Sequence, residues 1–213
     1  MSEKAPGGFK PPIEQIPFNE GEKLTKWNEI LAQVNELKDT LGHGIDDGIK
    51  ETVVALNIYD FMTSQSCEGH TNDGEKAPWI DFKVQGVNEA IIEAEKVMEE
   101  ADKAAAAGNP EEEVRALYKK AHAAQDAAEK PLYEKALELV PHLDDFYQGR
   151  QVPFDTRLIF RTGASRVRLI NQGAMLQSAR TAEIQAERLV AYQKEMKEFT
   201  EYLKNKYFQT LSG

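Results

Sequence analysis

The stretch TSQSCEGHTNDGEKAPWIDFKV, residues 63–84, contains the clearest strand signal in the chain. Its last six residues, WIDFKV, place apolar side chains at even positions and Trp, Asp and Lys at odd positions. This period of two is typical of a β-strand with one face in the core. Residues 62–67 are predicted to form a second short strand, and residues 68–78 a polar loop that joins the two.

Two further strands are predicted downstream, on either side of a hairpin turn with the sequence TGAS at 162–165. The flanking segments 157–161 and 166–170 both alternate, which directs their aliphatic and phenyl side chains to one face. The opposite face is expected to present a row of four arginines. They are Arg157, Arg161, Arg166 and Arg168.

Helical periodicity surrounds these strands. Apolar residues spaced by three and four predict helices over about 19–42 and 46–56, and a long helix from about 175 to 207. Each of these helices has one apolar face that must be buried. We expect all three to pack against one small sheet.

A helical insertion is predicted between the two strand pairs. Residues 86–107 and 111–129 are rich in alanine and glutamate, and the sequence GNP between them makes an antiparallel hairpin the expected arrangement. Pro131 and Pro141 are expected to divide the following residues into one or two further helical pieces. Residues 86–148 contain 15 acidic and 7 basic side chains, so most of the negative charge lies in this arm.

The predicted fold class is therefore α+β, with a small, mainly antiparallel sheet packed by long helices and a helical hairpin inserted at about 86–148. The chain has 213 residues, of which 41% are hydrophobic, and this is enough to bury one core. We expect residues 19–213 to form a single domain. Residues 1–18 are rich in proline and glycine and are expected to be a flexible arm.

Composition limits the classes of partner. The net charge is -10 and the pI about 5.0, which argues against nonspecific binding of nucleic acid or of an anionic membrane. No run approaches the roughly 20 apolar residues of a membrane span, and the first residues lack the apolar core of a signal peptide. A single cysteine is consistent with a reducing compartment. These features predict a cytoplasmic protein with neither membrane nor nucleic acid as its main partner.

The turn SCEGH at 66–70 is the first candidate site, because it contains the only cysteine and a histidine three residues beyond it. Cys67 and His70 are the candidate catalytic residues, since a thiol and an imidazole can act as nucleophile and base or bind one metal ion together. The turn could equally be structural. The spacing names neither a metal nor a cofactor.

A metal ion would need one or two further ligands beside this cysteine and histidine. The candidates that the sequence offers are His43, Asp46, Asp73 and Asp81. The imidazole is also expected to lower the thiol pKa if it lies beside the sulfur.

The arginine row is the second candidate site. A guanidinium group binds carboxylate or phosphate with two parallel hydrogen bonds, so four of them on one face favour a ligand with negative charge. Ser64, Ser66, Glu68 and Asp81 complete the expected ligand-binding set, and the amides of residues 68–70 could form a backbone nest for an anion. Alternatively, Asp81, Asp155 and acids of the helical arm neutralise the arginines.

Two functions follow from these sites. The first is binding of a small anionic ligand, a carboxylate or a phosphate, between the SCEGH turn and the arginine hairpin, with or without catalysis. The second is a protein-interaction module in which the helical arm and the long C-terminal helix bind a partner and the turn is structural. RNA contact by the arginine hairpin is a third hypothesis.

The order of motifs from 48 to 79 is similar to a pattern in a family of bacterial proteins without an established activity. In that pattern a helix like GIKETVVALN leads to a Ser-Cys-Glu-Gly-His turn, and a Pro-Trp strand follows. The turn also resembles the Ser-Cys-x-Gly element of the wybutosine-synthesising methyltransferase family. That family continues with arginine where this chain has His70, and the resemblance implies a role in tRNA methylation.

Overall fold

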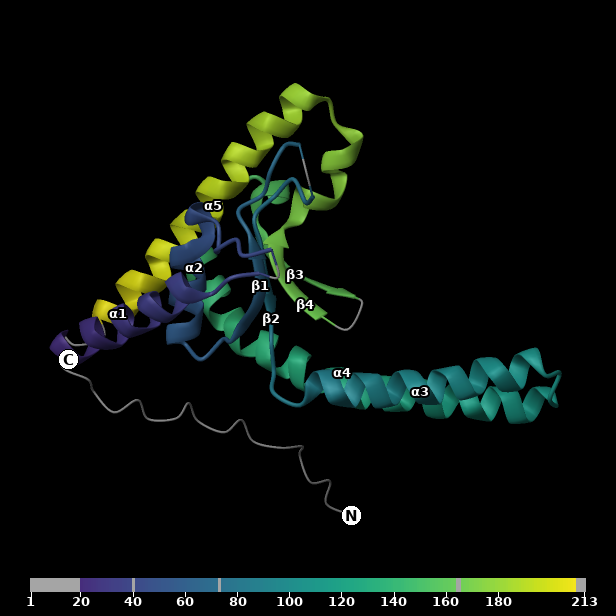
Figure 1. The fold of residues 1–213 in the computed structure, drawn as a ribbon. Coiled ribbons are helices and arrows are strands. Elements are labelled where there is room, and N and C mark those ends of the chain that lie inside the picture. The colour runs from purple at the N-terminus through teal and green to yellow at the C-terminus, as the bar shows by residue number, and fades with distance from the viewer. Residues whose placement is uncertain (1–19, 40, 73, 164–165, 210–213) are drawn as a thin grey trace, which may run out of the picture.

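A four-stranded antiparallel sheet lies at the centre of the protein, with the strand order β1-β2-β4-β3 (Figure 1). The strands are β1 (Thr63–Cys67), β2 (Trp79–Phe82), β3 (Leu158–Gly163) and β4 (Arg166–Asn171). Pairing of β2 with β4 joins the two predicted halves into one sheet. This order leaves β1 and β3 at the edges.

The computed structural model describes residues 20–39, 41–72, 74–163 and 166–209. The arm predicted over residues 1–18 lies outside these ranges.

One face of the sheet is buried under helices. Ile80 lies opposite Leu169, which lies opposite Phe160 on the far side, so one apolar row crosses three strands. The helices α1 (Glu20–Glu36), α2 (Asp47–Ile58) and α5 (Ala182–Gln209), with the later part of α4 (Glu111–Tyr147), contribute to the same core. The predicted α+β fold with a small helix-packed sheet is confirmed.

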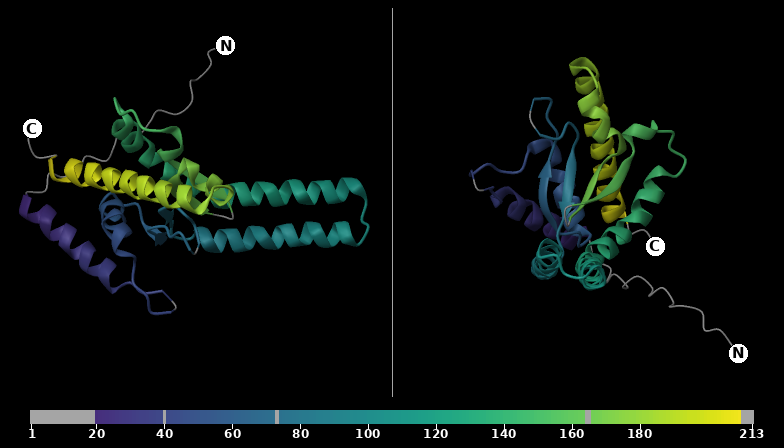
Figure 2. Two further views of the ribbon diagram at one scale, coloured as in Figure 1. Left: turned by 90° about the horizontal axis from the view of Figure 1, so that it is seen from above. Right: turned by 90° about the vertical axis from the view of Figure 1, so that its right-hand side faces the viewer.

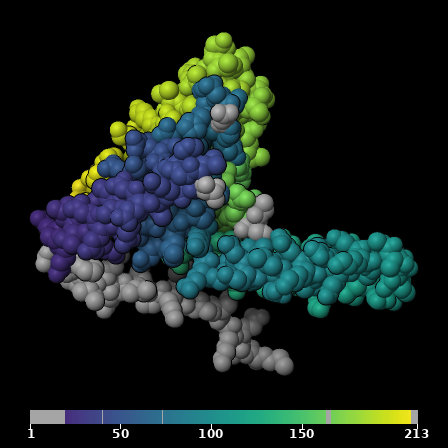
Figure 3. Space-filling view, in the orientation of Figure 1, coloured from purple at the N-terminus to yellow at the C-terminus, as the bar shows by residue number. Residues whose placement is uncertain are grey.

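The insertion is an antiparallel hairpin of α3 (Val87–Ala106) and the first part of α4. Gly108 has φ +73° at the turn, a conformation that glycine adopts without strain. The two helices run side by side away from the sheet (Figure 2). In the space-filling view the hairpin projects well beyond the rest of the molecule (Figure 3).

The expected division of the second arm helix is wrong, because α4 runs unbroken through Pro131 and Pro141. A proline inside a helix costs about 3 kcal/mol, since it removes one backbone hydrogen bond. Leu132, Leu139 and Leu143 are buried beside these prolines, and burial of each leucine contributes roughly 2 kcal/mol. Packing against the core therefore offsets the local preference.

Two other helix boundaries also differ from the prediction. The first helix ends at Glu36 instead of near Gly42, because the Asp39 carboxylate accepts hydrogen bonds from the amides of Leu41 and His43, both at 2.8 Å. These bonds form a turn in place of the last helical residues.

The last helix begins at Ala182, and residues 172–179 form the 3-10 helix η2 (Gln172–Ala179). The Gln185 side chain donates to the carbonyl oxygens of Gln177 and Arg180, each at 2.8 Å. These two carbonyl oxygens therefore accept from a side chain and not from the backbone amides that a continuous helix would place beside them. A second short 3-10 helix, η1 (Phe154–Thr156), precedes β3.

Among the described residues, no helix combines the length and the apolar composition that crossing a membrane requires.

Candidate functional site

Asp46, Cys67 and His70 converge at one end of the sheet. One donor atom from each lies within 4.8 Å of the others, and His70 Nε2 is 3.5 Å from Asp46 Oδ2. Cys67 is the last residue of β1, while Asp46 directly precedes α2. Of the three described candidates, His43, Asp46 and Asp81, Asp46 is the one that joins the cysteine and the histidine.

The turn that holds Cys67 and His70 requires a glycine between them. Gly69 has φ +82°, and a Cβ there would lie 2.6 Å from the carbonyl carbon of Ala77 and 2.8 Å from Leu189 Cδ1. The Gln193 side chain of α5 donates to the Glu68 carbonyl at 3.1 Å. The turn is therefore held between the β2 side of the loop and the last helix.

Glu68 caps the helix that begins beside the turn. The amide of Gly48, in the first turn of α2, donates to Glu68 Oε2 at 2.8 Å. A Cβ at position 48 would lie 2.5 Å from that oxygen, so a glycine allows the carboxylate to approach. This cap comes from a residue twenty positions away in the sequence.

Asp46 occupies the N-cap position of α2, yet its side chain makes no capping hydrogen bond. Aspartate is among the preferred N-cap residues, because its carboxylate can accept from the first helical amides. Here Asp46 Oδ2 instead accepts from the Glu68 amide at 3.1 Å and points toward the cysteine and histidine. Capping by Glu68 therefore leaves the Asp46 carboxylate available to the site.

Cys67 is a neutral thiol in this environment. Burial raises its pKa above the ordinary 9.0, and the negative charges of Asp46 and Glu68 act in the same direction. The Gly69 amide, 3.3 Å from Sγ, opposes this shift and does not reverse it. The expected lowering of the thiol pKa is therefore wrong, and Cys67 is not a preformed thiolate nucleophile.

The expected backbone nest is also wrong, because each amide of the turn already has a partner. The amides of Glu68 and Gly69 donate to Asp46 Oδ2 and Cys67 Sγ, and that of His70 donates to the Glu75 carbonyl at 3.3 Å. These amides therefore cannot bind an anion without losing bonds.

The two serines do not join the turn either. Ser66 lies opposite Ile80, and paired residues of an antiparallel ladder share a face, so Ser66 points toward the helix-covered side. Ser64 is exposed and donates to the Asp81 carbonyl at 3.4 Å.

The arginines lie on the face opposite the core, as the alternation predicts, but most of them are neutralised there. Arg168 donates to both carboxylate oxygens of Asp81 at 2.6 and 2.9 Å and lies 3.6 Å from the ring centroid of Trp79. Arg161 forms an ion pair with Glu75. The alternative of internal neutralisation therefore holds for these arginines.

The acids that neutralise the row are not all those expected. Glu75, in the loop before β2, was not predicted. The sequence signal that could have indicated it is an acidic residue in the polar loop that leads into the strand of Asp81. Asp155 pairs instead with Arg180 at 3.1 Å and Arg188 at 3.5 Å. Arg157 is exposed, with its guanidinium 5.5 Å from the Tyr147 ring centroid.

The two predicted sites are neighbours on the sheet. Cys67 lies opposite Trp79, whose ring stacks on Arg168, and one loop contains both His70 and Glu75. The guanidinium groups of Arg161 and Arg168 nevertheless form their ion pairs with Glu75 and Asp81. The metal-type cluster and the arginine row are therefore adjacent groups with separate partners.

The other two described candidate ligands, His43 and Asp81, lie elsewhere. His43 is exposed and pairs with Asp39 at 3.7 Å, and Asp81 is held by Arg168. Asp73 lies outside the described residues. Gln193, which holds the turn, has no sequence signal that could have revealed it.

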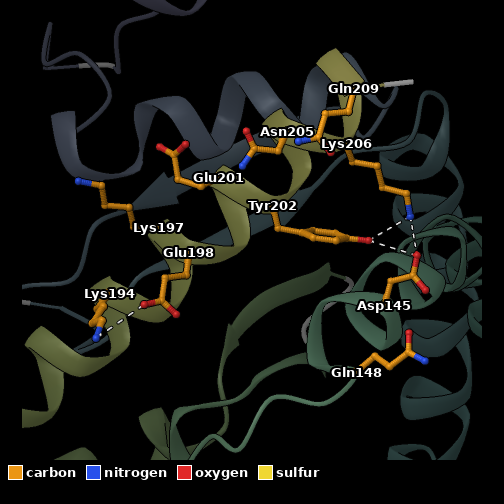
Figure 4. Close-up of a pocket in the computed structure, with 10 residues that line it drawn as sticks. All are labelled: Asp145, Gln148, Lys194, Lys197, Glu198, Glu201, Tyr202, Asn205, Lys206 and Gln209. Carbon is orange, nitrogen blue, oxygen red and sulfur yellow. Dashed lines mark hydrogen bonds and ion pairs between the residues drawn. The ribbon is translucent and has the colours of Figure 1, made fainter. Parts of the chain in front are cut away.

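A wide groove of about 920 Å³ lies between the end of α4 and α5 (Figure 4). Its charged side chains largely pair with one another. Lys206 and Tyr202 both point to Asp145, at 2.6 and 3.3 Å, and Lys194 lies 3.7 Å from Glu198. This groove offers no concentration of one charge.

No family model, no curated protein and no solved structure matches this chain. The family resemblances of the SCEGH turn remain predictions.

Proposed function

We propose that the protein binds a divalent transition-metal ion through Asp46, Cys67 and His70. Zn²⁺ is the ion with which we compare the geometry of the site. The remaining coordination position would accept water or a small anionic ligand such as a carboxylate. The convergence of the three donor atoms within 4.8 Å supports this proposal.

The donor spacing is close to that of a tetrahedral site. Two ligands about 2.0 Å from zinc in tetrahedral geometry are about 3.3 Å apart. The observed separation of His70 Nε2 and Asp46 Oδ2 is 3.5 Å. The sulfur lies within 4.8 Å of both atoms, compared with about 3.5 Å in a tetrahedral zinc site, so each of these separations has to shorten by at most roughly 1.3 Å. A change of the cysteine rotamer can supply such a movement.

The donor types also fit. Cysteine sulfur, histidine nitrogen and aspartate oxygen are all zinc ligands, and three protein ligands with an open fourth position are typical of catalytic zinc sites. The side chains of His70 and Asp46 are 46% and 35% exposed, so an external ligand can reach this position. A metal here would supply Lewis acidity.

Groups around the ligands hold them in place. The Glu68 amide fixes Asp46, and the Gly69 amide donates to the cysteine sulfur, as amides do around metal-bound thiolates. The positive charge of a bound cation would also stabilise the thiolate and so remove the cost of ionising the buried thiol, which metal ligation deprotonates. The high thiol pKa of the free site is thus compatible with metal binding.

Titration of the full chain with Co²⁺ and Zn²⁺ tests the proposal. Co²⁺ bound to a thiolate gives a ligand-to-metal charge-transfer band, so the spectrum reports directly on Cys67. Cys67→Ser should abolish the band, and Asp46→Asn and His70→Ala should each weaken binding at least tenfold, as expected for loss of a ligand.

His43→Ala is the matched control, because this histidine also pairs with an aspartate and has no cysteine beside it. Its affinity should equal that of the wild type. Absence of the charge-transfer band in the wild-type protein, or equal binding by wild type and Cys67→Ser, would contradict the proposal.

A second candidate function is partner binding by the hairpin of α3 and α4. The projection of this acidic hairpin away from the sheet favours it (Figure 1). Exposed acids near the hairpin turn, Glu111 and Glu112, can be changed to lysine without disturbing a core. If the arm binds a basic partner, Glu111→Lys with Glu112→Lys should weaken that complex and leave metal binding unchanged.

A further inference from the structure

A second hollow, of about 480 Å³, lies between the strands β1 and β2 and the first two turns of α3. This volume is within the usual range of small-molecule sites. Its lining includes the polar and charged residues Ser64, Asp81, Lys83 and Arg166 and the apolar residues Ile91, Ile92 and Leu132. We call Lys83 and Arg166 the basic wall of the groove, and Ile91, Ile92 and Leu132 its apolar wall.

The basic wall follows from the sheet register. Arg168 lies opposite Asp81 in the antiparallel pair of β4 and β2. Arg166 lies two residues before Arg168 on β4, and Lys83 lies two residues after Asp81, just beyond the end of β2. Chain alternation therefore places both cations toward the face of Asp81 and Arg168. Two like charges on one face repel each other, and an anion bound between them would remove this repulsion.

These two cations are poorly neutralised. Lys83 is exposed and forms no ion pair with any residue that the structure describes. Arg166 is 48% exposed, and its contact with Asp81 is long, at 3.4 Å. That carboxylate already accepts two shorter bonds from Arg168, so little of its charge is left for the groove.

The acid Glu95 also lines the groove, but on α3 it lies seven residues beyond Asn88, or about 10 Å along the helix axis. Asp81 also lines the groove, but Arg168 occupies its carboxylate, so Lys83 and Arg166 face Glu95 as the one remaining acid of the lining and leave an excess of one positive charge. The amide of Asn88 and the hydroxyl of Ser64 add hydrogen-bonding groups to the lining.

The other wall offers apolar surface to a ligand. The side chain of Ile92 is 51% exposed, although isoleucine is among the residues that are most often buried. Ile91 and Leu132 also line the groove and are 7% and 3% exposed. A hydrocarbon chain laid on this wall would cover Ile92.

We propose that this groove binds a small amphipathic carboxylate, with the carboxylate between Arg166 and Lys83 and the hydrocarbon chain along Ile91, Ile92 and Leu132. A guanidinium group donates two parallel hydrogen bonds to a carboxylate, and the lysine adds a second positive charge. This site is distinct from the Asp46, Cys67 and His70 cluster and does not depend on a metal.

The test uses the full chain and four probes, which are hexanoate, its neutral analogue hexanamide, acetate and inorganic phosphate. Binding is followed by calorimetry and by amide chemical shifts at the groove. Hexanoate should bind at least tenfold more tightly than hexanamide and acetate, because only hexanoate has both the charge and the chain. Tighter binding of phosphate than of hexanoate would overturn the proposed ligand class.

Variants locate the site. Lys83→Gln should weaken hexanoate binding at least tenfold, and this exposed residue without an ion pair can be changed without a risk to folding. Arg166→Gln should act in the same direction, and Ile92→Ser should weaken hexanoate binding without changing that of acetate.

Arg157→Gln is the matched control, since this arginine belongs to the same hairpin segment and does not line the groove. Its affinity for hexanoate should equal that of the wild type, and so should that of Cys67→Ser. Failure of hexanoate to bind, or equal loss in Arg157→Gln and Lys83→Gln, would overturn the proposal. A normal result with Cys67→Ser keeps this test separate from the metal proposal.

Discussion

Glu68 and Asp46 are expected to substitute for each other as the cap of α2, and a double-mutant cycle can measure this exchange. In the native state Glu68 accepts from the Gly48 amide, while Asp46 stands at the N-cap position without capping. Rotation of the Asp46 side chain would bring its carboxylate to the same helix end. Removal of Glu68 should therefore recruit Asp46 as the replacement cap.

The expected magnitudes follow from the value of an N-cap. Loss of a capping carboxylate usually costs about 1 kcal/mol of unfolding free energy. Glu68→Ala alone should cost less than about 0.5 kcal/mol, because Asp46 restores most of the lost bond. In an Asp46→Ala background no substitute exists, and the same change should cost about 1 to 1.5 kcal/mol.

Urea denaturation of the four proteins, with a chelator present to remove metal, measures these differences. The expected coupling between the two sites is about 1 kcal/mol, well above the roughly 0.3 kcal/mol within which independent mutations add. Additive costs would refute the capping exchange.

The same exchange has a consequence for metal binding. In Glu68→Ala the metal must remove Asp46 from its new capping position, which costs about 1 kcal/mol and lowers affinity about fivefold. Glu68→Gln can still accept from the Gly48 amide and should retain most of the affinity. Equal losses in the alanine and glutamine variants would show that the charge of Glu68, and not its cap, supports the site.

Three further predictions concern titration and buried charge. Burial raises the pKa of the Cys67 thiol, and metal ligation displaces the proton of this thiol. Zn²⁺ affinity should therefore rise about tenfold per pH unit between about pH 7 and 8.5. Calorimetry in buffers of different ionisation enthalpy should show the released proton. Burial, with the charge of Lys206, lowers the pKa of His142 below its ordinary 6.5. The unfolded state therefore binds more protons than the folded state just below pH 6.5, and the free energy of unfolding should fall as the pH drops through this range. His142→Phe should reduce that fall, measured by urea denaturation at pH 5 and 7. Asp81→Asn should cost about 2 kcal/mol in the same assay, because Arg168 would keep a buried charge with only its longer contact to Glu75, at 3.3 Å. Asp39→Asn at the surface should cost less than about 1 kcal/mol.

The strands and their faces could be predicted from the sequence because they depend on local alternation. The period of two in β2 and in the arginine hairpin assigned Ile80 to the core and Arg168 to the opposite face, and the register agrees. The fold class and the helical hairpin followed from periodicity and from the GNP break. These are signals that neighbouring residues provide by themselves.

Helix ends were less predictable, because they depend on competition between local and distant bonds. α4 continues through two prolines since its leucines reach the core, and α5 starts late since Gln185 binds carbonyls of the preceding turn. Propensity alone indicated the opposite at both places. The gain from packing is not visible in a local pattern.

The sequence by itself determined the chemical types at the site, namely one thiol, one imidazole, several acids and a row of guanidinium groups. Only the tertiary structure decided which of them meet. Asp46 joins Cys67 because Glu68 takes over the cap of α2, and the arginines are neutralised because a loop and a neighbouring strand place Glu75 and Asp81 against them. Such pairings depend on contacts between segments distant in the chain, and spacing along one sequence contains no measure of those distances.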